Sequence, residues 1–241
     1  MSLIYINPYS FSAPAATDPD FANVSLLLHG DGANNSTTFT DSSSNNFTLS
    51  RVGDVKISTT QSNPFGGSSI FFDGAGDYLT LANNSVFTFP SSFTVEAWVY
   101  PTAIVDAFDS IFTLRWIGTW NSGGPGLVLC VGCLVVENGR VENYTGGNIP
   151  LNQWTHLAVS RDGISTAGVN TRVFINGSAV LSTITTLSLG NTNAPAVGVL
   201  DTNGGSARSM LTGYIDELRV TKGVARYTST FTPPTAPFPD A

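Results

Sequence analysis

Short apolar runs and polar turns alternate along nearly the whole chain. From about residue 24, segments rich in β-branched and aromatic residues are separated by turns rich in Gly, Asn, Ser or Asp, as in "SIFFD", "WTHLAVSR" and "TRVFING". No stretch keeps a helical apolar period for more than two turns. About a dozen such strands, without helical crossovers between them, predict an all-β fold in which antiparallel sheets pack face to face as a sandwich.

The segment "SFTVEAWVY" indicates how one of these strands packs. Alternation along a strand places four apolar residues on one face: Phe93, Val95, Ala97 and Val99. The opposite face is amphipathic and carries Glu96 and Trp98. We therefore expect the apolar face to line the core between two sheets.

The dipeptide Asn176-Gly177 lies between two strand-like runs. Asn-Gly favours the two-residue turns in which both central residues have positive φ. The pair therefore predicts a hairpin that joins two adjacent antiparallel strands.

The segment "GYIDELRV" carries an acidic pair in an otherwise apolar strand. Regular alternation would place one set of residues on a single face: Tyr214, Asp216, Leu218 and Val220. Asp216 would then lie among apolar neighbours, where a carboxylate is costly unless it is satisfied. Three solutions remain open from the residues alone: backbone N–H donors at a bulge, an arginine such as Arg219 or Arg172, or a bound cation.

The two ends of the chain differ from the middle. Residues 1–21 hold three prolines and several bulky apolar side chains, among them Leu3, Ile4, Tyr5, Tyr9 and Phe11, which predict an N-terminal arm that docks on the domain or on a neighbouring subunit, with a frayed leader as the alternative. Asn7 and Pro8 interrupt the first apolar run, so we expect neither a signal peptide nor a membrane anchor. Residues 22–241 are predicted to form a single domain with an extended, proline-rich C-terminal tail after Gly223.

The charge balance narrows the possible partners. Only 11% of the residues are charged and the net charge is −7, with an isoelectric point near 4.5. No cluster of Lys and Arg occurs, so binding to nucleic acid is not expected. An acidic surface remains compatible with cation binding.

The two cysteines, Cys130 and Cys133, lie in the run "LVLCVGCLV". Positions three apart in a continuous strand point to opposite faces, so neither a mutual disulfide nor a zinc site is expected. We interpret them as small apolar strand residues.

Several fragments, in order, resemble the laminin G-like jelly-roll family of the concanavalin A-like lectin and glucanase superfamily. They are "VSLLLHGDG", "FGGSSIFFDGAGDYLTL", "FTVEAWVYP", "WTHLAVSRDG", "VFINGS" and "GYIDELRVTKGVARYTSTFTPPTAPFP", within residues 22–239. The last fragment is similar to a subset common in bacteriophage tail, fibre and decoration proteins. The resemblance implies a concanavalin A-like jelly roll and, through this subset, a location in a virion.

The resemblance also implies a structural calcium ion. A late-strand aspartate that matches Asp216 would be one ligand, together with backbone carbonyls. Calcium prefers carboxylate and carbonyl oxygens, and Asp31 and Asp73 lie in glycine-rich turns that could supply them. Asp and Gly are also good turn formers, which remains the competing explanation for these residues.

Sugar sites often use exposed aromatic rings together with amide and carboxylate hydrogen bonds. The segment "RWIGTWNSGGPG" offers Trp116, Trp120 and Asn121 as a candidate ligand-binding platform on a predicted loop. The alternative is that both indoles fold back and anchor the loop. Trp98 and Trp154 occupy framework positions of the family, which implies that they are packing residues.

No pattern of catalytic residues is apparent. Related glucanases place two carboxylates on one strand face, whereas Asp216 and Glu217 are adjacent and Glu96 stands alone in its strand. We therefore predict a non-enzymatic virion structural protein with a surface-recognition or adhesion role, whose partners are other virion proteins or copies of itself. A glycan-binding module is the first alternative, and a divergent glycoside hydrolase is the second.

Overall fold

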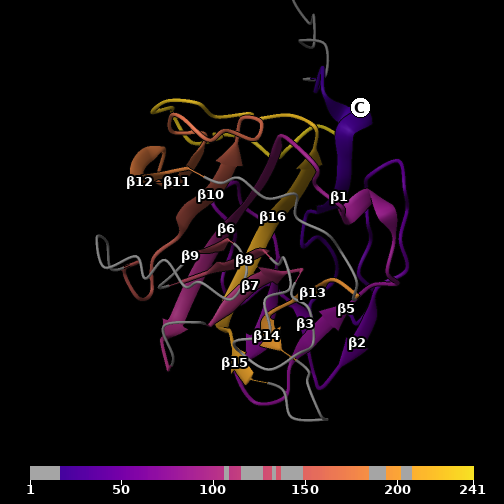
Figure 1. The fold of residues 1–241 in the computed structure, drawn as a ribbon. Coiled ribbons are helices and arrows are strands. Elements are labelled where there is room, and N and C mark those ends of the chain that lie inside the picture. Colours follow the sequence, from indigo (N-terminus) through magenta and orange to yellow (C-terminus); the bar gives the residue numbers. More distant parts are fainter. Residues whose placement is uncertain are drawn as a thin grey trace, which may run out of the picture.

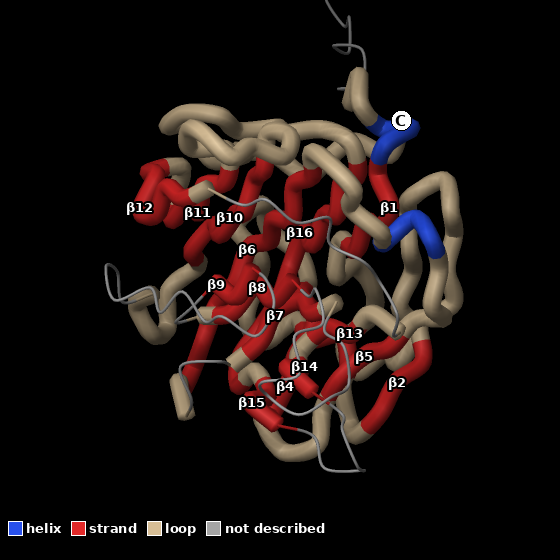
Figure 2. Tube along the Cα trace, in the orientation of Figure 1, coloured by secondary structure: helices blue, strands red, loops and turns tan. Residues whose placement is uncertain are grey.

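The computed structural model describes residues 17–105, 109–114, 127–131, 134–136, 149–184, 194–201 and 208–241. Figure 2 shows that the regular secondary structure of this part of the chain is almost entirely strand, connected by long loops. Its helices are two 3-10 turns, η1 (Phe21–Asn23) and η2 (Ser85–Phe87), and none of the described helices could span a bilayer. The predicted all-β fold is confirmed.

Eight strands form the first sheet, sheet A, and the long strands β6 and β16 lie at its centre (Figure 1). Its order is β12-β11-β10-β6-β16-β4-β3, and β1 also pairs with β16. The strands are β1 (Val24–Leu28), β3 (Lys56–Ser58), β4 (Ser69–Asp73), β6 (Phe93–Ala103), β10 (Thr155–Arg161), β11 (Thr171–Ile175), β12 (Ser178–Thr183) and β16 (Thr212–Lys222).

Eight shorter strands form sheet B, in the order β14-β15-β7-β13-β5-β2, with β8 paired to β7 and β9 paired to β8. They are β2 (Ser50–Val52), β5 (Tyr78–Thr80), β7 (Ser110–Thr113), β8 (Leu127–Cys130), β9 (Leu134–Val136), β13 (Ala196–Val197), β14 (Val199–Asp201) and β15 (Arg208–Met210). Among the described strands, β15 and β7 pair in parallel and the other pairings are antiparallel.

The core lies between the two sheets. The apolar face predicted for β6 is fully buried there, at Phe93, Val95, Ala97 and Val99. Phe112 and Val197 of sheet B belong to the same apolar cluster. This is the face-to-face packing of a β-sandwich, and the prediction for β6 is confirmed.

The Asn176-Gly177 hairpin is also confirmed, and it has a second role. Both residues have positive φ, 47° and 75°, and they join β11 to β12. The tail packs directly on this turn, because the Phe231 N–H donates to the Gly177 carbonyl at 3.0 Å. A Cβ on Gly177 would collide with the Phe231 carbonyl oxygen, so both the turn and the tail require glycine here.

The strand β16 departs from the alternation expected from its sequence. Asp216 pairs with Trp98 but Arg219 pairs with Glu96, so β16 has one residue more than β6 across this interval. Glu217 lies at the bulge as the extra residue, and its backbone φ is 51°. Beyond such a bulge, each side chain of the strand lies on the face opposite to the one that regular alternation predicts.

The expected facial assignment of β16 is therefore wrong. Ile215, Leu218 and Val220 share the core-facing side, whereas Tyr214 packs against Phe71 on the outer side. The prediction had grouped Leu218 and Val220 with Asp216. Regular alternation did not allow for the residue inserted at the bulge.

Because of the bulge, Arg219 reaches Glu96 on the outer face of sheet A. Nε and Nη2 of Arg219 donate to Oε1 of Glu96 at 3.0 and 2.8 Å, and both residues are buried. Burial alone would raise the pKa of Glu96, but the charge of Arg219, followed by hydrogen bonds from His156 and Tyr227, lowers it to about 2. Glu96 is therefore charged under all ordinary conditions.

The same network fastens the C-terminal tail across the sheet. Tyr227 donates its hydroxyl to Oε2 of Glu96 at 2.7 Å, and Arg226 binds Asp18 through two nitrogens at 3.0 and 2.7 Å. Asp18 also accepts from Arg219 at 3.1 Å, although it lies within the predicted N-terminal arm. The described contacts of the domain thus begin earlier than residue 22.

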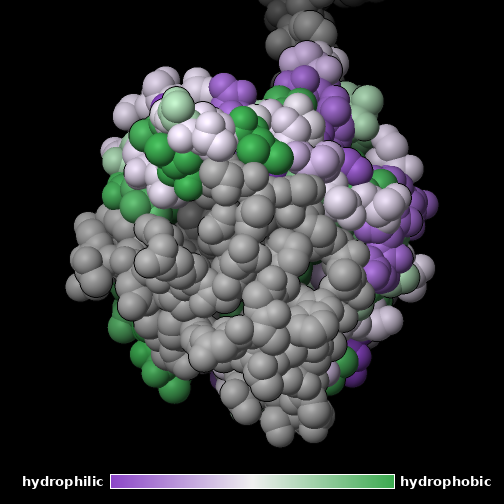
Figure 3. Space-filling view, in the orientation of Figure 1, coloured by the Kyte–Doolittle hydropathy of each residue, from purple (hydrophilic) through white to green (hydrophobic). Residues whose placement is uncertain are grey.

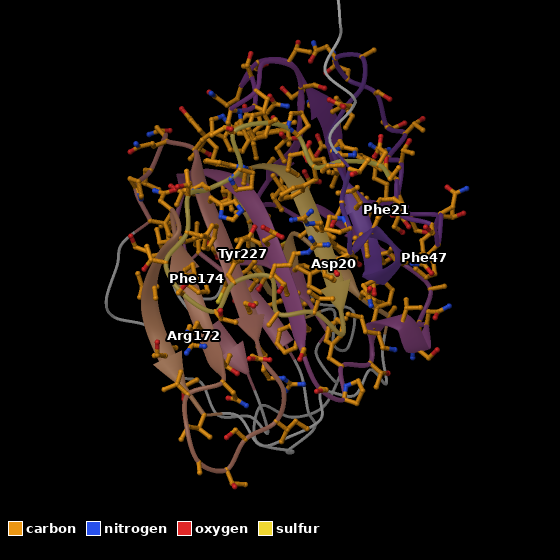
Figure 4. The ribbon with its side chains drawn as sticks, turned by 90° about the horizontal axis from the view of Figure 1, so that it is seen from above. Asp20, Phe21, Phe47, Arg172, Phe174 and Tyr227 are labelled. Atoms are coloured by element: carbon orange, nitrogen blue, oxygen red, sulfur yellow. The ribbon has the colours of Figure 1, made fainter. Side chains whose placement is uncertain are left out.

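Aromatic stacking completes the attachment of the tail. The rings of Tyr227 and Phe231 are parallel, with centroids 3.5 Å apart, and both pack against Phe174 of β11. Figure 4 shows Tyr227 and Phe174 together over the strands of sheet A. Residues 223–241 contain no strand, and this tail packs on sheet A through Tyr227 and Phe231.

The prediction for the cysteines is wrong. Cys130 is disulfide-bonded, and Cys133 is the only other cysteine in the sequence. Strand β8 ends at Cys130, so the alternation that argued against a bridge applies only to a continuous strand.

We expect Glu96→Gln to lower the free energy of unfolding by about 3–5 kcal/mol, because it removes the carboxylate that pairs with two nitrogens of the buried Arg219 guanidinium and leaves it only the contact with Asp18. The folded pKa of Glu96 is depressed, so its contribution is present above its usual value of 4.5 and disappears as the pH falls toward 2. Urea denaturation at pH 7 and at pH 3 should therefore show a larger deficit at pH 7. Arg51→Gln, which changes an exposed arginine, is the control, and an equal deficit at both pH values would contradict the argument.

Candidate functional site

A notch occurs where β16 changes its neighbour. One half of β16 pairs with β4, up to the Ile215–Ile70 pair, and the other half pairs with β1, from the Leu218–Leu28 pair onward. Asp216 and Glu217 fall between these halves, opposite the gap between the end of β1 and the start of β4. In Figure 1, β1 lies beside the C-terminus, so the end of the chain is close to this region.

The segment that follows β1 closes tightly over the notch. Gly30 has φ = 71°, and a Cβ on it would lie 2.6 Å from Oδ1 of Asp216, so its backbone passes directly over this carboxylate. The Ser68 hydroxyl donates to the Gly30 carbonyl and accepts from the Gly32 N–H, both at 3.0 Å. Ser68 thereby ties the segment after β1 to the segment before β4.

A second segment, residues 61–68, covers the notch from the outer face of sheet A. Phe65 packs edge-on against Trp98, with ring centroids 6.0 Å apart. Trp154 donates its indole N–H to the Ser62 carbonyl at 2.7 Å. Both tryptophans are half-buried and help to hold this cover in place, in agreement with a packing role.

Asp216 is fully buried beneath these segments, and neither of its carboxylate oxygens has a hydrogen-bond partner within normal geometry. Burial, and then the negative charges of Glu217 and Asp31, raise its pKa to about 9, which the nearby Glu217 N–H and Asn63 amide offset only in part. Buried polar groups are normally satisfied. Of the three solutions that the sequence left open, Arg219 is excluded because it pairs with Glu96 and Asp18.

Glu217, in contrast, is fully engaged. Its Oε1 lies 2.7 Å from Nδ1 of His29, and its Oε2 accepts the Phe238 N–H at 2.8 Å. The other nitrogen of His29, Nε2, lies 2.7 Å from Oδ1 of Asp240. Burial alone would lower the pKa of His29, but the hydrogen bond and charge of Glu217, and then those of Asp240, raise it to about 9. The imidazolium therefore bridges the bulge to the C-terminal tail.

A pocket of about 250 Å³ opens beside this bridge. Its described lining residues are Leu28, His29, Gly30, Asp31, Phe39, Thr40, Ser42, Ile57, Ile70 and Asp240. An apolar floor, one aromatic ring and several hydroxyl and carboxylate groups thus meet in one hollow. In Figure 3 the described surface on the right, over the segment between β1 and β2, is mainly hydrophilic.

The three predicted metal ligands are not all brought together. Asp31 and Asp216 interact electrostatically at the notch. Asp73 pairs with Thr212 at the far end of β4, beside Asp54 and Asp77, whose ligand atoms lie within 4.8 Å of its own.

The carboxylate of Asp77 already accepts the backbone N–H groups of Asp54 and Asp73, at 2.6 and 3.0 Å. The Asp77 carboxylate therefore fixes the turns around Gly53 and Gly74. The predicted ligand platform, Trp116, Trp120 and Asn121, lies outside the described residues.

Sequence reasoning did not identify His29, Phe39 and Asp240 as site residues. They come from three separate parts of the chain, and none belongs to a local motif. The one available signal was the acidic pair at Asp216 and Glu217. An acidic pair in an apolar strand requires two different partners, and one of them proved to be a histidine.

Comparison with solved structures identifies the fold independently. The chain is similar to domain 4 of AbnA, a GH43 extracellular arabinanase from Geobacillus stearothermophilus solved with arabinotriose, with a TM-score of 0.60 and 20% identity over 84% of this chain and 94% of that domain. The binding domain of Paraclostridial Mosquitocidal Protein 1 gives a TM-score of 0.55, with 15% identity over 84% of this chain and 49% of that one.

A structure of botulinum neurotoxin type C, whose cell entry depends on interaction with two ganglioside molecules, gives a TM-score of 0.53, with 17% identity over 85% of this chain and 49% of that one. This chain therefore spans about half of the two toxin chains. At these identities the similarity concerns the fold alone.

Comparison with curated proteins finds no match. A family model, by contrast, matches residues 73–226, which make up more than half of the chain. The matched region includes the whole of β6, β10, β11 and β16, the strands that build the centre of sheet A. The chain belongs to the concanavalin A-like lectin/glucanases superfamily, in its laminin G-like branch.

Proposed function

We propose that this chain is a non-catalytic recognition domain that binds carbohydrate. The observation that carries the proposal is the pocket beside the notch, where oxygen-rich side chains, an aromatic ring and an apolar floor converge. Its volume of about 250 Å³ lies just below the range of about 300–1,000 Å³ that is usual for drug-sized ligands, which suits a single sugar ring.

The lining groups match the two kinds of surface that a sugar presents. Asp31, Thr40 and Ser42 supply oxygens that can accept hydrogen bonds from sugar hydroxyls. The half-buried ring of Phe39 offers a flat apolar surface for the C–H groups of a sugar face. Few but convergent polar groups on an apolar floor are typical of ligand sites.

The same pocket is poorly suited to glycoside hydrolysis. Hydrolysis requires one carboxylic acid that stays protonated in contact with the glycosidic oxygen and a second carboxylate across the bond. Asp216 has a raised pKa of about 9, but it is fully buried and is not among the described lining residues. This supports a domain that binds a glycan without cleaving it.

The related structures favour the same function. The arabinanase domain was solved with arabinotriose, and the neurotoxin depends on gangliosides, so sugars are ligands of proteins with this fold. The relation does not specify where on this chain a sugar would bind. The position comes from the pocket itself.

We further propose that the domain works in a bacteriophage virion, in contact with other virion proteins or with copies of itself. The support is the similarity of residues 213–239 to the tail, fibre and decoration proteins of phages. A virion protein that binds a glycan on the host surface would combine this location with the proposed carbohydrate binding.

A structural calcium ion is the third part of the proposal. The environment of Asp216 fits a divalent cation, because two carboxylate oxygens are buried without hydrogen-bond partners. Asp31 is close enough to interact with this carboxylate and would be the second side-chain ligand. When bound, the ion would neutralise Asp216 and fix the segment after β1 that forms the pocket wall.

We expect Phe39→Ala to weaken the binding of a neutral oligosaccharide by about tenfold or more, because it removes the aromatic surface of the pocket. Isothermal titration with arabinotriose, followed by a panel of neutral oligosaccharides, measures this effect. The half-buried Tyr78 lies in β5 and outside the described pocket lining, so Tyr78→Ala is the matched control.

Two outcomes would count against this site. Wild-type protein that binds no glycan of the panel at millimolar concentration would contradict the proposed function. A double variant, Trp116→Ala with Trp120→Ala, tests the competing platform. If it loses binding while Phe39→Ala keeps it, the sugar site belongs to residues 115–126 instead.

We expect calcium to raise the melting temperature, because an ion at a hundredfold excess over its Kd stabilises the folded state by about 2.7 kcal/mol, or roughly 5–10 °C for a chain of this size. Asp216→Asn should abolish this gain. Without calcium, the folded protein holds the Asp216 proton more tightly than the unfolded chain, so the contribution of Asp216 to stability is most favourable below about pH 3.8 and is lost as the pH rises toward 9. The Asn variant should lack this contribution to the pH dependence.

Asp73→Asn is the control for the calcium experiment. It should keep the calcium response if the ion binds at Asp216. A response that is lost in Asp73→Asn but kept in Asp216→Asn would place the ion among Asp54, Asp73 and Asp77. Thermal scans with calcium or EDTA at pH 5, 7 and 9 distinguish these outcomes.

We expect the full chain to self-associate, and a variant that lacks residues 1–16 to be monomeric, if the apolar arm docks on a neighbouring copy. The deletion ends before Asp18, because Asp18 binds Arg219 and Arg226 and is needed for stability. Light scattering coupled to size-exclusion chromatography measures both masses. A full chain that stays monomeric at high concentration would contradict arm-mediated assembly.

A further inference from the structure

The pocket has an uneven charge distribution. Asp31 and Asp240 line it, Glu217 lies behind it, and His29 is the only cation among its described lining residues. The imidazolium of His29 is already bridged by two carboxylates, at 2.7 Å on each side. Carboxylates therefore outnumber cations in and around the pocket.

Two described cations outside the lining, Arg219 and Lys56, are also engaged. Arg219 stacks on the Phe238 ring, with its guanidinium carbon 3.7 Å from the ring centroid, and it donates to Glu96 and Asp18. Lys56 lies over the ring of Phe71, 5.5 Å from its centroid, on a neighbouring strand. No guanidinium or ammonium group lines the described part of the pocket, so an anionic ligand would find no unpaired partner there.

One of the carboxylates is supplied by the C-terminal tail. Asp240 is held by His29, while the Phe238 N–H is bound by Glu217 and the Ala241 carbonyl accepts from the Asp18 N–H at 2.7 Å. These contacts fix the last residues of the chain against the notch. The tail thus forms one wall of the pocket and determines part of its charge.

We infer that this pocket selects uncharged saccharides and rejects sialylated, uronic or sulfated ones, with Asp31 and the tail residue Asp240 as the residues that determine this specificity. The inference rests on the proposed carbohydrate-binding function and identifies its ligand class. Hydroxyl groups of a neutral sugar can donate to both carboxylates, whereas an acidic sugar would place a like charge beside them. A divalent ion on Asp216 and Asp31 would reduce the negative charge without reversing it, because Glu217 and Asp240 remain.

The test compares matched neutral and acidic probes. Binding of galactotriose and of trigalacturonate, and of lactose and of 3′-sialyllactose, is measured by titration in low salt, with and without calcium. We expect the neutral member of each pair to bind at least about tenfold more tightly, because like charges brought together disfavour the acidic partner. The double variant Asp31→Asn with Asp240→Asn should reduce this preference to within about threefold.

The controls separate the pocket from general charge effects. Asp162→Asn removes an exposed carboxylate in the turn after β10, outside the described pocket lining, and should leave the preference unchanged. Asp31→Asn alone keeps the His29–Asp240 contact, so it remains informative if the double variant folds poorly. Circular dichroism of each variant verifies the fold.

The outcomes distinguish this inference from the proposed function. Acidic probes that bind as tightly as neutral ones would overturn the charge selectivity and leave carbohydrate binding intact. A neutral preference that persists in the Asp31 and Asp240 variants would overturn the assignment to these two residues. If none of the neutral or acidic probes binds, the carbohydrate-binding function fails and the selectivity fails with it.

Discussion

The structure depends on a single constraint in β16. This strand must pair with β6 along one edge and with both β4 and β1 along the other, and the bulge at Asp216 and Glu217 lies where the second edge changes partner. The extra residue reverses the alternation of side chains beyond it. Leu218 can therefore face the core while Arg219 faces outward, an arrangement that a regular strand starting from the core-facing Ile215 would not produce.

The bulge also explains why three buried carboxylates behave differently. Glu96 faces Arg219 across the strand pair, and Glu217 is turned toward His29, so both have cationic partners. Asp216 precedes the reversal and remains on the covered outer face, without a hydrogen-bond partner for either oxygen. An unpaired buried carboxylate is costly as an anion and must take a proton or a cation. The same inserted residue thus places the buried Arg219–Glu96 ion pair and the unpartnered Asp216 carboxylate on one face of the sheet.

The sequence was sufficient for the fold because the fold depends on local patterns. The alternation in residues 93–99 and the Asn176-Gly177 turn are both encoded within a few neighbouring residues, and both were predicted correctly. The bulge was not, because Glu217 has positive φ and nothing in "YIDELRV" marks a break in alternation. An insertion of this kind becomes apparent only when the partner strands are known.

The site was predicted less well for a related reason. Asp31 and Asp216 were named from chemistry and family resemblance, and they do lie close enough to interact. His29 and Asp240 are 211 residues apart in the sequence, and their contact depends on the path of the tail. No local pattern of hydrophobic and polar residues predicts the path of the tail.

The path of the tail also links the stability of the fold to the proposed binding site. Residues 226–231 are fastened by the buried ion-pair network and by stacking on Phe174, so the last residues reach the notch along a fixed route. A wall that is already ordered before the ligand arrives loses little conformational entropy on binding. The Glu96 network and the aromatic stack thus help to hold Asp240 beside His29. In this arrangement the tail contributes to the proposed binding site together with the strands.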